Sequence, residues 1–287
     1  DNFLKDTEVI NSDIIEVHNR PNYIKFIKKN FTKKVSLYFH NDPLSMDGSR
    51  SIQDRMYLLN NIDKLIFNSI WSKKRFFLDL NINTSTLKDV NVCYQSADKV
   101  KINFNKKENI ITFIGKLNRA KGYDIFGNAI IDILNKYKNW KAIVIGDEER
   151  EIINFKHPRL KIIGFKRNSF ILNLLKKTSI SVVCSRWQEP FGRASLEAAS
   201  RGSAVIISNT GGLPETTISG ITLKTLNKNE LVNSIEKLIT NKKKLLKSQK
   251  DNYKNFKFTH NYISNLVDNI REKTFFKTLN IKKPFIL

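Results

Sequence analysis

The 287-residue sequence has little of what disulfide scaffolds, metal centres and membrane spans require. It holds two cysteines, Cys93 and Cys184, whose wide separation fits neither a disulfide pair nor a metal site and indicates a reducing compartment. No apolar run approaches the ~18 residues of a membrane span, and no signal peptide is visible. We therefore expect a cytoplasmic protein. The chain opens at Asp1 without an initiator methionine, which predicts a missing N-terminal segment.

Acidic residues are also scarce. The 27 Asp and Glu face 50 Lys and Arg, which gives a formal charge of +23. That balance favours an anionic partner, such as nucleic acid, an acidic membrane surface or a phosphorylated ligand. The lysines are dispersed along the chain, so charge alone does not choose among these three.

Short apolar runs alternate with amphipathic stretches along most of the chain. Because several runs are rich in Val and Ile and apolar throughout, they predict strands covered on both faces. Regular alternation of strands and helices predicts an α/β fold with parallel sheets. The expected strands are 14–18, 35–40, 64–68, 90–94, 110–114, 142–145, 160–164, 180–184 and 204–208. The expected helices are 23–29, 52–60, 70–80, 123–137, 170–177, 193–201, 230–240, 242–253 and 260–276.

A polar, lysine-rich stretch at 98–109 predicts an interdomain linker. We accordingly expect a partial N-terminal Rossmann-like domain over 1–100 and a second domain over 101–257. A C-terminal helix within 258–287 is expected to pack back toward the first domain. The first half carries only about four strand–helix units, in agreement with a truncated N-terminal domain.

Residues 189–197 read EPFGRASLE and place two glutamates around a turn that leads into a helix. A helix N-terminus offers unpaired amides and a partial positive charge, which suit phosphate. Gly192 lets the backbone approach such a ligand. Carboxylates suit vicinal hydroxyls, so Glu197 and Glu189 could hold the two ends of a nucleotide sugar. Taken alone, such a pair is more typical of an ordinary turn and a solvated helix residue.

A second site of the same kind lies at 112–128, TFIGKLNRAKGYDIFGN. A strand ends at Gly115, a basic turn follows, and a helix begins after Gly122. Lys116 and Lys121 therefore stand where cations could neutralise a diphosphate, although a solvated turn would show the same residues.

Several motifs in order resemble retaining glycosyltransferases of family 4, which have the GT-B fold of two Rossmann-like domains facing a cleft. The resemblance covers roughly residues 10–275 and is closest to bacterial cell-surface polysaccharide and lipopolysaccharide enzymes. Glu189 and Glu197 match the family's E-x7-E pattern. The matching stretches are DIIEVHNRP (13–21), LYFHNDP (37–43), FNSIWSKKRF (67–76), GKLNRAKG (115–122), SRWQEPFGRASLEAASRG (185–202) and NTGGLPE (209–215).

The resemblance implies a hexosyltransferase-type enzyme that moves a sugar, with retention, from a UDP- or GDP-sugar to a glycan or lipid-linked acceptor. The donor would bind the second domain and the acceptor the first. As catalytic residues it implies His40, at the reacting centre, and Glu189, on the donor sugar; His18 fits a structural role as well as an active one. The implied donor-binding residues are Lys116, Lys121, Phe191, Gly192 and Glu197.

The sequence departs from the family pattern at two points. Lys116 stands where Arg is frequent, so the bidentate fork is lost. The Gly-rich loop that opens the N-terminal domain is absent, because the chain begins after it. No Asp-x-Asp and no His or Cys cluster with ligand spacing occurs, which predicts a metal-independent enzyme without a cofactor.

Three other interpretations stay open. A sugar-nucleotide epimerase shares the fold, and a catalytically inactive donor-binding scaffold would share the site. A nucleic-acid-binding protein is suggested by charge alone, but no recognised module is present, and we expect no specific nucleic acid. The lysine-rich stretches at 242–250 and 271–283 instead suggest peripheral binding to the acidic inner face of the cytoplasmic membrane.

Overall fold

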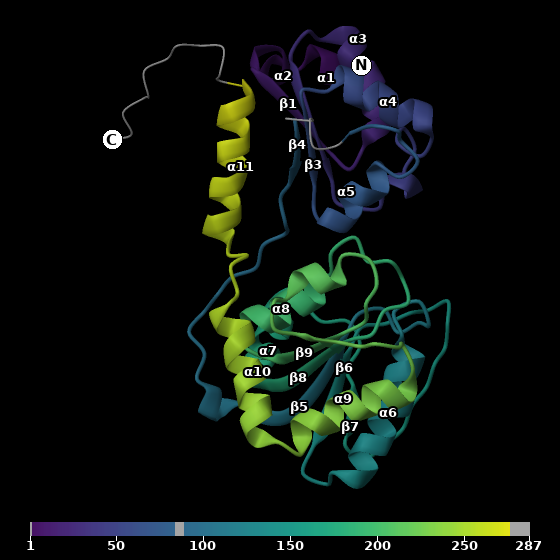
Figure 1. Cartoon of the computed structure of the whole chain (residues 1–287), viewed down its shortest axis with the longest axis vertical. Coiled ribbons are helices and arrows are strands. Elements are labelled where there is room, and N and C mark those ends of the chain that lie inside the picture. The colour runs from purple at the N-terminus through teal and green to yellow at the C-terminus, as the bar shows by residue number, and fades with distance from the viewer. Residues whose placement is uncertain (1, 84–88, 276–287) are drawn as a thin grey trace. The chain divides into compact units, whose positions relative to one another are not determined.

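The computed structural model describes residues 2–83 and 89–275. The chain forms two units, each with its own parallel sheet (Figure 1). Of the described residues, unit 1 contains 2–83, 89–95 and 261–275, and unit 2 contains 96–260. The chain therefore leaves unit 1, builds all of unit 2, and returns to unit 1 for its last helix.

Unit 1 has a four-stranded sheet in the order β1-β2-β3-β4. Since successive strands are parallel neighbours, right-handed crossovers place the connecting helices on one face. The strands are β1 (Ile14–His18), β2 (Lys34–Phe39), β3 (Lys64–Phe67) and β4 (Val90–Val92). The helices are α1 (Asn2–Lys5), α2 (Thr7–Asn11), α3 (Ile24–Asn30), α4 (Ile52–Asn61), α5 (Ile70–Phe76) and the returning α11 (His260–Phe275).

The core of unit 1 follows the alternation of side chains along β1 and β2. Phe39, Phe67 and Phe76 are buried together, with ring centroids 5.2–5.5 Å apart. Glu16 of β1 instead pairs with Arg271 of α11. The alternation thus assigns one face of β1 to the core and the other to the last helix.

Unit 2 has a six-stranded parallel sheet in the order β10-β9-β8-β5-β6-β7. Helices α6 and α9 pack together on one side of it, and α7, α8 and α10 contact the strands on the other (Figure 1). The strands are β5 (Glu108–Ile114), β6 (Lys141–Ile145), β7 (Leu160–Ile162), β8 (Thr178–Val183), β9 (Ala204–Ile207) and β10 (Ile221–Thr222). The helices are α6 (Tyr123–Lys136), α7 (Asn168–Lys177), α8 (Arg193–Ser200), α9 (Lys228–Ile239) and α10 (Lys242–Lys254).

The structure confirms the nine expected strands and nine expected helices, apart from shifts at their ends. Sequence reasoning missed α1, α2 and the two-residue β10. The helix expected over 260–276 ends at Phe275 in α11, and residue 276 lies outside the described residues.

The stretch at 98–109 is not a free linker, because it is bound to unit 2. The Lys107 ammonium donates to the carbonyls of Leu175, Thr178 and Arg201 at 2.8–2.9 Å. The Lys99 ammonium donates to the carbonyl of Lys254, the last residue of α10, and to that of Phe256, which follows the helix. The polar composition reflects lysines that satisfy the ends of helices and strands, and the boundary between the units falls earlier, between residues 95 and 96.

Candidate functional site

The strand order of unit 2 reverses between β5 and β8. The chain runs from β5 outward to β6 and β7, and then returns to the other side of β5 with β8. In open α/β sheets, ligands bind outside the carboxyl ends of the strands at such a reversal. The loop after β5, residues 115–122, and the loop after β8, residues 184–192, both start at this point. Topology therefore brings the two predicted donor motifs to one edge of the sheet.

Backbone and side-chain hydrogen bonds join these two loops. The amides of Arg186 and Trp187 both donate to the Ala120 carbonyl at 2.9 Å. The Arg186 guanidinium also forms a bidentate pair with Asp124 in the first turn of α6, at 2.6 and 2.8 Å. Paired guanidinium–carboxylate bonds fix orientation as well as distance. The two loops thus form one surface.

Lys121 and Glu189 meet on that surface. The Lys121 ammonium lies 2.5 Å from the Glu189 carboxylate, and the two side chains are 30% and 14% exposed. A third loop joins here, because the Gly212 amide donates to the Glu189 carbonyl at 2.6 Å and the Gly211 amide to the Gln188 side chain at 2.8 Å. The NTGGLPE motif is therefore part of the same site.

Lys116 lies in the same loop as Lys121 but is exposed. It forms neither an ion pair nor a hydrogen bond with any residue in the described ranges. Its ammonium is consequently available to an external anion.

Two helices begin at this surface with a glycine in the left-handed region. Gly122 (φ 75°) precedes α6 and Gly192 (φ 119°) precedes α8. A Cβ on Gly122 would lie 1.8 Å from the Cys184 carbonyl oxygen, and one on Gly192 would lie 2.4 Å from a methyl of Leu213. Within the described chain, neither helix start has a side-chain cap. The first-turn amides of α8 are thus left to other acceptors, whereas the Tyr123 amide at the start of α6 already donates to the Asn118 carbonyl at 3.1 Å.

The side chain of Phe191 serves the core of unit 2. Its ring is 1% exposed and lies edge-on to Phe258, with centroids 6.1 Å apart. The prediction for Phe191 concerns its backbone amide, so a buried ring is compatible with it.

Glu197 is a buried carboxylate on α8 whose orientation is set by two donors. It accepts from Arg193 at 2.7 Å, one turn earlier on the same helix, and from Asn168 at 3.1 Å. Asn168 is the first residue of α7, so this pair connects α8 to the loop after β7. Sequence reasoning missed both partners. The i,i+4 spacing of Arg193 and Glu197 was a readable signal, whereas nothing in the sequence pointed to Asn168.

His40 belongs to unit 1 and directly follows β2, which ends one residue earlier than expected. Its Nε2 lies 3.0 Å from Nδ1 of His18, the last residue of β1, and the two rings are stacked. Asn19 accepts from the His40 amide, and Asn68 donates to its carbonyl. Neighbouring strand ends thus hold the imidazole in place.

The environment of His40 favours the neutral ring. Burial, and then repulsion from His18, lower the pKa of His40 to about 4. In the hydrogen bond between His18 Nδ1 and His40 Nε2, one nitrogen donates its proton and the other accepts it. A cavity of about 280 Å3 lies beside this strand end, lined in part by Asn19, Arg20 and Asn41.

The structure places Lys116, Lys121, Phe191, Gly192, Glu189 and Glu197 in unit 2 and His40 in unit 1. Among residues 2–83 and 89–275, no three His, Cys, Asp or Glu side chains are arranged to hold a metal ion. No helix in those ranges is long and apolar enough to cross a membrane.

Two Rossmann-like units with parallel sheets, one carrying this site where its strand order reverses, define a protein of the GT-B fold. The comparison with known structures agrees. A crystal structure of Anabaena Alr3699/HepE in complex with UDP-glucose superposes with a TM-score of 0.72 at 18% identity, covering 93% of this chain and 79% of that one. The chain belongs to the family "Glycosyl transferases group 1", whose model matches residues 95–256.

Two curated relatives align with stretches of this chain at low sequence identity. Spore coat protein SA of Bacillus subtilis is 24% identical over 231 residues, which cover 71% of this chain and 61% of that protein. An uncharacterized 42.6 kDa protein in the cps region of Klebsiella pneumoniae is 29% identical over 175 residues, or 53% of this chain and 45% of that protein. The chain thus spans about half to three-fifths of the length of these relatives.

Proposed function

We propose that the chain is a retaining, metal-independent glycosyltransferase of family 4. It transfers a hexose from a UDP- or GDP-sugar to a glycan or lipid-linked acceptor in cell-surface polysaccharide synthesis. The observation that carries the proposal is the convergence of Lys121, Glu189 and the starts of α6 and α8 at the strand-order reversal of unit 2. The Anabaena neighbour crystallised with UDP-glucose and the Klebsiella relative in a cps region support the donor and the setting.

In this proposal unit 2 binds the donor. The ammonium groups of Lys116 and Lys121, with the Phe191 and Gly192 amides at the start of α8, bind the diphosphate. Glu197, already oriented by two donors, accepts the ribose hydroxyls. Two lysines at the diphosphate offset the charge that develops as it leaves, which is the role a metal ion has in other transferases.

In this proposal Glu189 of unit 2 contacts the donor sugar, and His40 of unit 1 contacts the acceptor. Glu189 accepts from a hydroxyl of the donor hexose. The acceptor oxygen bonds to the anomeric carbon on the face from which the diphosphate departs, and its proton passes to the leaving phosphate oxygen. His40, neutral at pH 7, orients the acceptor hydroxyl or donates to that phosphate. Unit 1 is therefore the acceptor side in this scheme.

We further propose a cytoplasmic enzyme that works at the inner face of the cytoplasmic membrane. The cysteines, Cys93 and Cys184, are both buried and free, which fits a reducing compartment. The lipid-linked class of acceptor and the excess of basic residues motivate the membrane.

The test is calorimetric titration with UDP and with GDP in the presence of EDTA. We expect one nucleotide to bind, and Glu197→Ala to weaken binding at least tenfold, because hydrogen bonds to a charged group are worth about 1.5–3 kcal/mol. Glu236→Ala is the matched control: like Glu197, Glu236 accepts from one cationic and one neutral donor, here Lys136 and the Tyr137 hydroxyl, but it lies on α9.

Each other outcome has a defined meaning. If neither nucleotide binds the folded protein, or if binding requires a divalent metal, the proposal is wrong at the donor site. Donor binding by the complete protein without turnover would indicate an inactive scaffold. Conversion of the donor to its epimer, with no sugar transferred, would indicate an epimerase. Product with the inverted anomeric configuration would contradict retention alone.

A further inference from the structure

Helix α10 carries the densest run of lysine in the described chain outside the site. Six of its thirteen residues are lysine and one, Asp251, is acidic. Lys243, Lys247, Lys250 and Lys254 recur at i, i+4, i+7 and i+11, so they share one side of the helix, which we call the lysine face. All four are exposed, whereas Gln249 and Asn252 on the opposite side are buried against unit 2.

The charges of the lysine face are largely unmatched. Only Lys247 has an acidic partner, Asp251, one turn further along the helix. Lys243, Lys250 and Lys254 form no ion pair with any residue that the structure describes. Like charges three or four positions apart on a helix repel. An external polyanion would relieve that repulsion.

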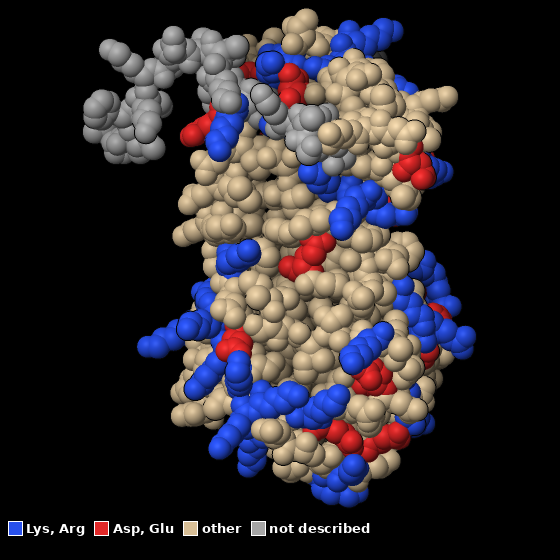
Figure 2. Space-filling model, viewed as in Figure 1, with Lys and Arg blue, Asp and Glu red and all other residues tan. Residues whose placement is uncertain are grey.

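The positive charge extends beyond α10. Lys101 and Lys250 border a hollow of about 550 Å3 next to Phe104, and neither lysine is paired within the described ranges. Figure 2 shows Lys and Arg side chains gathered over the part of unit 2 where Figure 1 places α10 and the chain leading into β5. The helix and the preceding segment thus present one basic surface.

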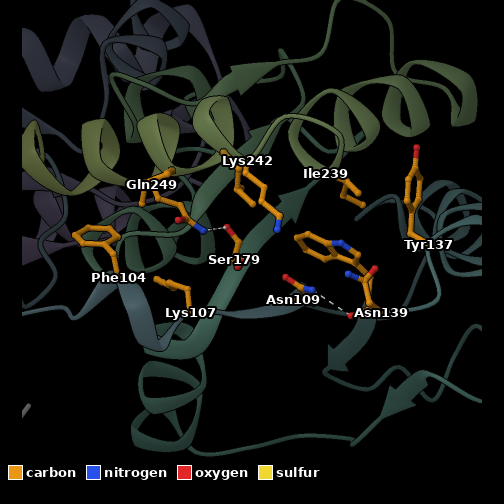
Figure 3. Close-up of a pocket in the computed structure, with 12 residues that line it drawn as sticks. Phe104, Lys107, Asn109, Tyr137, Asn139, Ser179, Ile239, Lys242 and Gln249 are labelled. Atoms are coloured by element: carbon orange, nitrogen blue, oxygen red, sulfur yellow. Dashed lines mark hydrogen bonds between the residues drawn. The ribbon is translucent and has the colours of Figure 1, made fainter.

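A pocket of about 370 Å3, lined by both apolar and polar side chains, adjoins the lysine face at the amino-terminal edge of the sheet (Figure 3). Lys242 points into it from α10, while Ile239 and Tyr137 form part of its wall (Figure 3). Leu246, which also lines it, is 40% exposed among the lysines. Cations arranged around apolar groups match a phospholipid surface, where phosphates lie directly above acyl chains.

We propose that the lysine face, together with Leu246 and the pocket at Lys242, docks unit 2 on an anionic phospholipid bilayer. The inference rests on the proposed function, which places the enzyme at a membrane, and it assigns membrane binding to one surface of unit 2. A bilayer fits better than nucleic acid because the aromatic rings here are not stacking platforms. Trp140 is 4% exposed, and Phe104 packs edge-on against Tyr253.

The experiment is co-sedimentation of the full chain with vesicles at low salt. The vesicles contain phosphatidylcholine alone, or phosphatidylcholine and phosphatidylserine in equal parts. One variant carries Lys→Gln at positions 243, 247, 250 and 254. The control carries Lys→Gln at 138, 156, 161 and 224, which removes the same charge from exposed lysines of unit 2 that have no ion partner within the described residues.

We expect binding only to the vesicles with phosphatidylserine, a loss of about tenfold or more in the lysine-face variant, and a loss below about threefold in the control. Equal losses in the two variants would show that the overall charge acts and not this surface. No binding by the parent protein, or equally tight binding to duplex DNA, would also overturn the proposal.

Titration of the same proteins with UDP and with GDP separates the two proposals. If either nucleotide binds all three proteins but vesicles bind none, the docking surface is wrong and the donor site stands. If vesicles bind as expected but no nucleotide does, the donor site is wrong and the docking surface stands.

Discussion

Glu189→Gln should change the affinities for UDP and for UDP-glucose in opposite directions. The Glu189 carboxylate has the Lys121 ammonium as its ion partner at 2.5 Å. In the proposed complex the donor diphosphate takes the same ammonium, so the carboxylate and the phosphate compete for one cation. The hexose of the donor needs the Glu189 carboxylate, whereas UDP has no hexose.

The expected sizes follow from the geometry. Two like charges that share one ammonium lie about 5–6 Å apart and repel by about 3 kcal/mol at an effective dielectric constant of about 20. Because the Lys121 side chain is 30% exposed, we expect water and salt to reduce this to about 1 kcal/mol. UDP should then bind the variant about fivefold more tightly. UDP-glucose gains the same amount but loses a charged hydrogen bond of about 1.5–3 kcal/mol, and should bind more weakly.

Calorimetric titration of the parent, Glu189→Gln and Glu236→Gln with both ligands tests the prediction. Glu236 pairs with Lys136 at 2.8 Å on α9, so its replacement should leave both affinities unchanged. Weaker UDP binding in Glu189→Gln would refute the reasoning, since it would mean that the ion pair holds Lys121 in place for the diphosphate. So would a change of both affinities in the same direction.

Two further predictions concern stability. The pKa of His40 is lowered from 6.5 to about 4, so the unfolded chain takes up this proton first as pH falls, and the stability present above pH 6.5 is lost toward pH 4. Such a pKa shift corresponds to about 3 kcal/mol of unfolding free energy, which solvent screening reduces to about 2 kcal/mol. Between pH 7 and 4.5, the free energy of unfolding in urea should therefore fall by about 2 kcal/mol more in the parent than in His40→Gln. If both lose the same, the assignment fails. Gly122→Ala should destabilise by more than about 3 kcal/mol in thermal unfolding, because a Cβ there meets the Cys184 carbonyl at 1.8 Å. The control is Gly164→Ala, which is also at positive φ but has open space around it, and we expect it to destabilise by about 1 kcal/mol. Equal destabilisation by the two variants would mean that the positive φ, and not the contact with Cys184, causes the loss of stability.

The fold was readable from the sequence to the extent that burial follows apolar runs. β9 is buried throughout and is a continuous apolar segment in the sequence, and β8 is buried along nearly its whole length although Thr178, Ser179 and Ser181 interrupt its apolar residues. β10 has two residues, one of them exposed, and so leaves no such run. Lys99 and Lys107 led to the wrong prediction of a free linker for a related reason. Composition records that they are charged but not that their ammonium groups are satisfied by carbonyls from distant elements.

The sequence predicted individual residues of the candidate site but not the contacts between them. The motifs pointed to Lys121, Glu189 and Glu197, but not to the contact between the first two, because 68 positions separate them and only the sheet topology closes that distance. Asn168 reaches Glu197 in the same way, across the loop that precedes α7. The two catalytic roles and the donor roles of these residues stay predictions until the titrations are made.

The path of the chain between the two units also sets an order for their folding during synthesis. Unit 2 is one continuous segment, residues 96–260, whereas unit 1 needs Arg271 of α11 to pair with Glu16 of β1. A ribosome reaches Arg271 only after it has made every residue of unit 2, and domains fold as units while the chain emerges. Unit 2 can therefore close before unit 1 is complete, although β1 to β4 of unit 1 precede it in the chain.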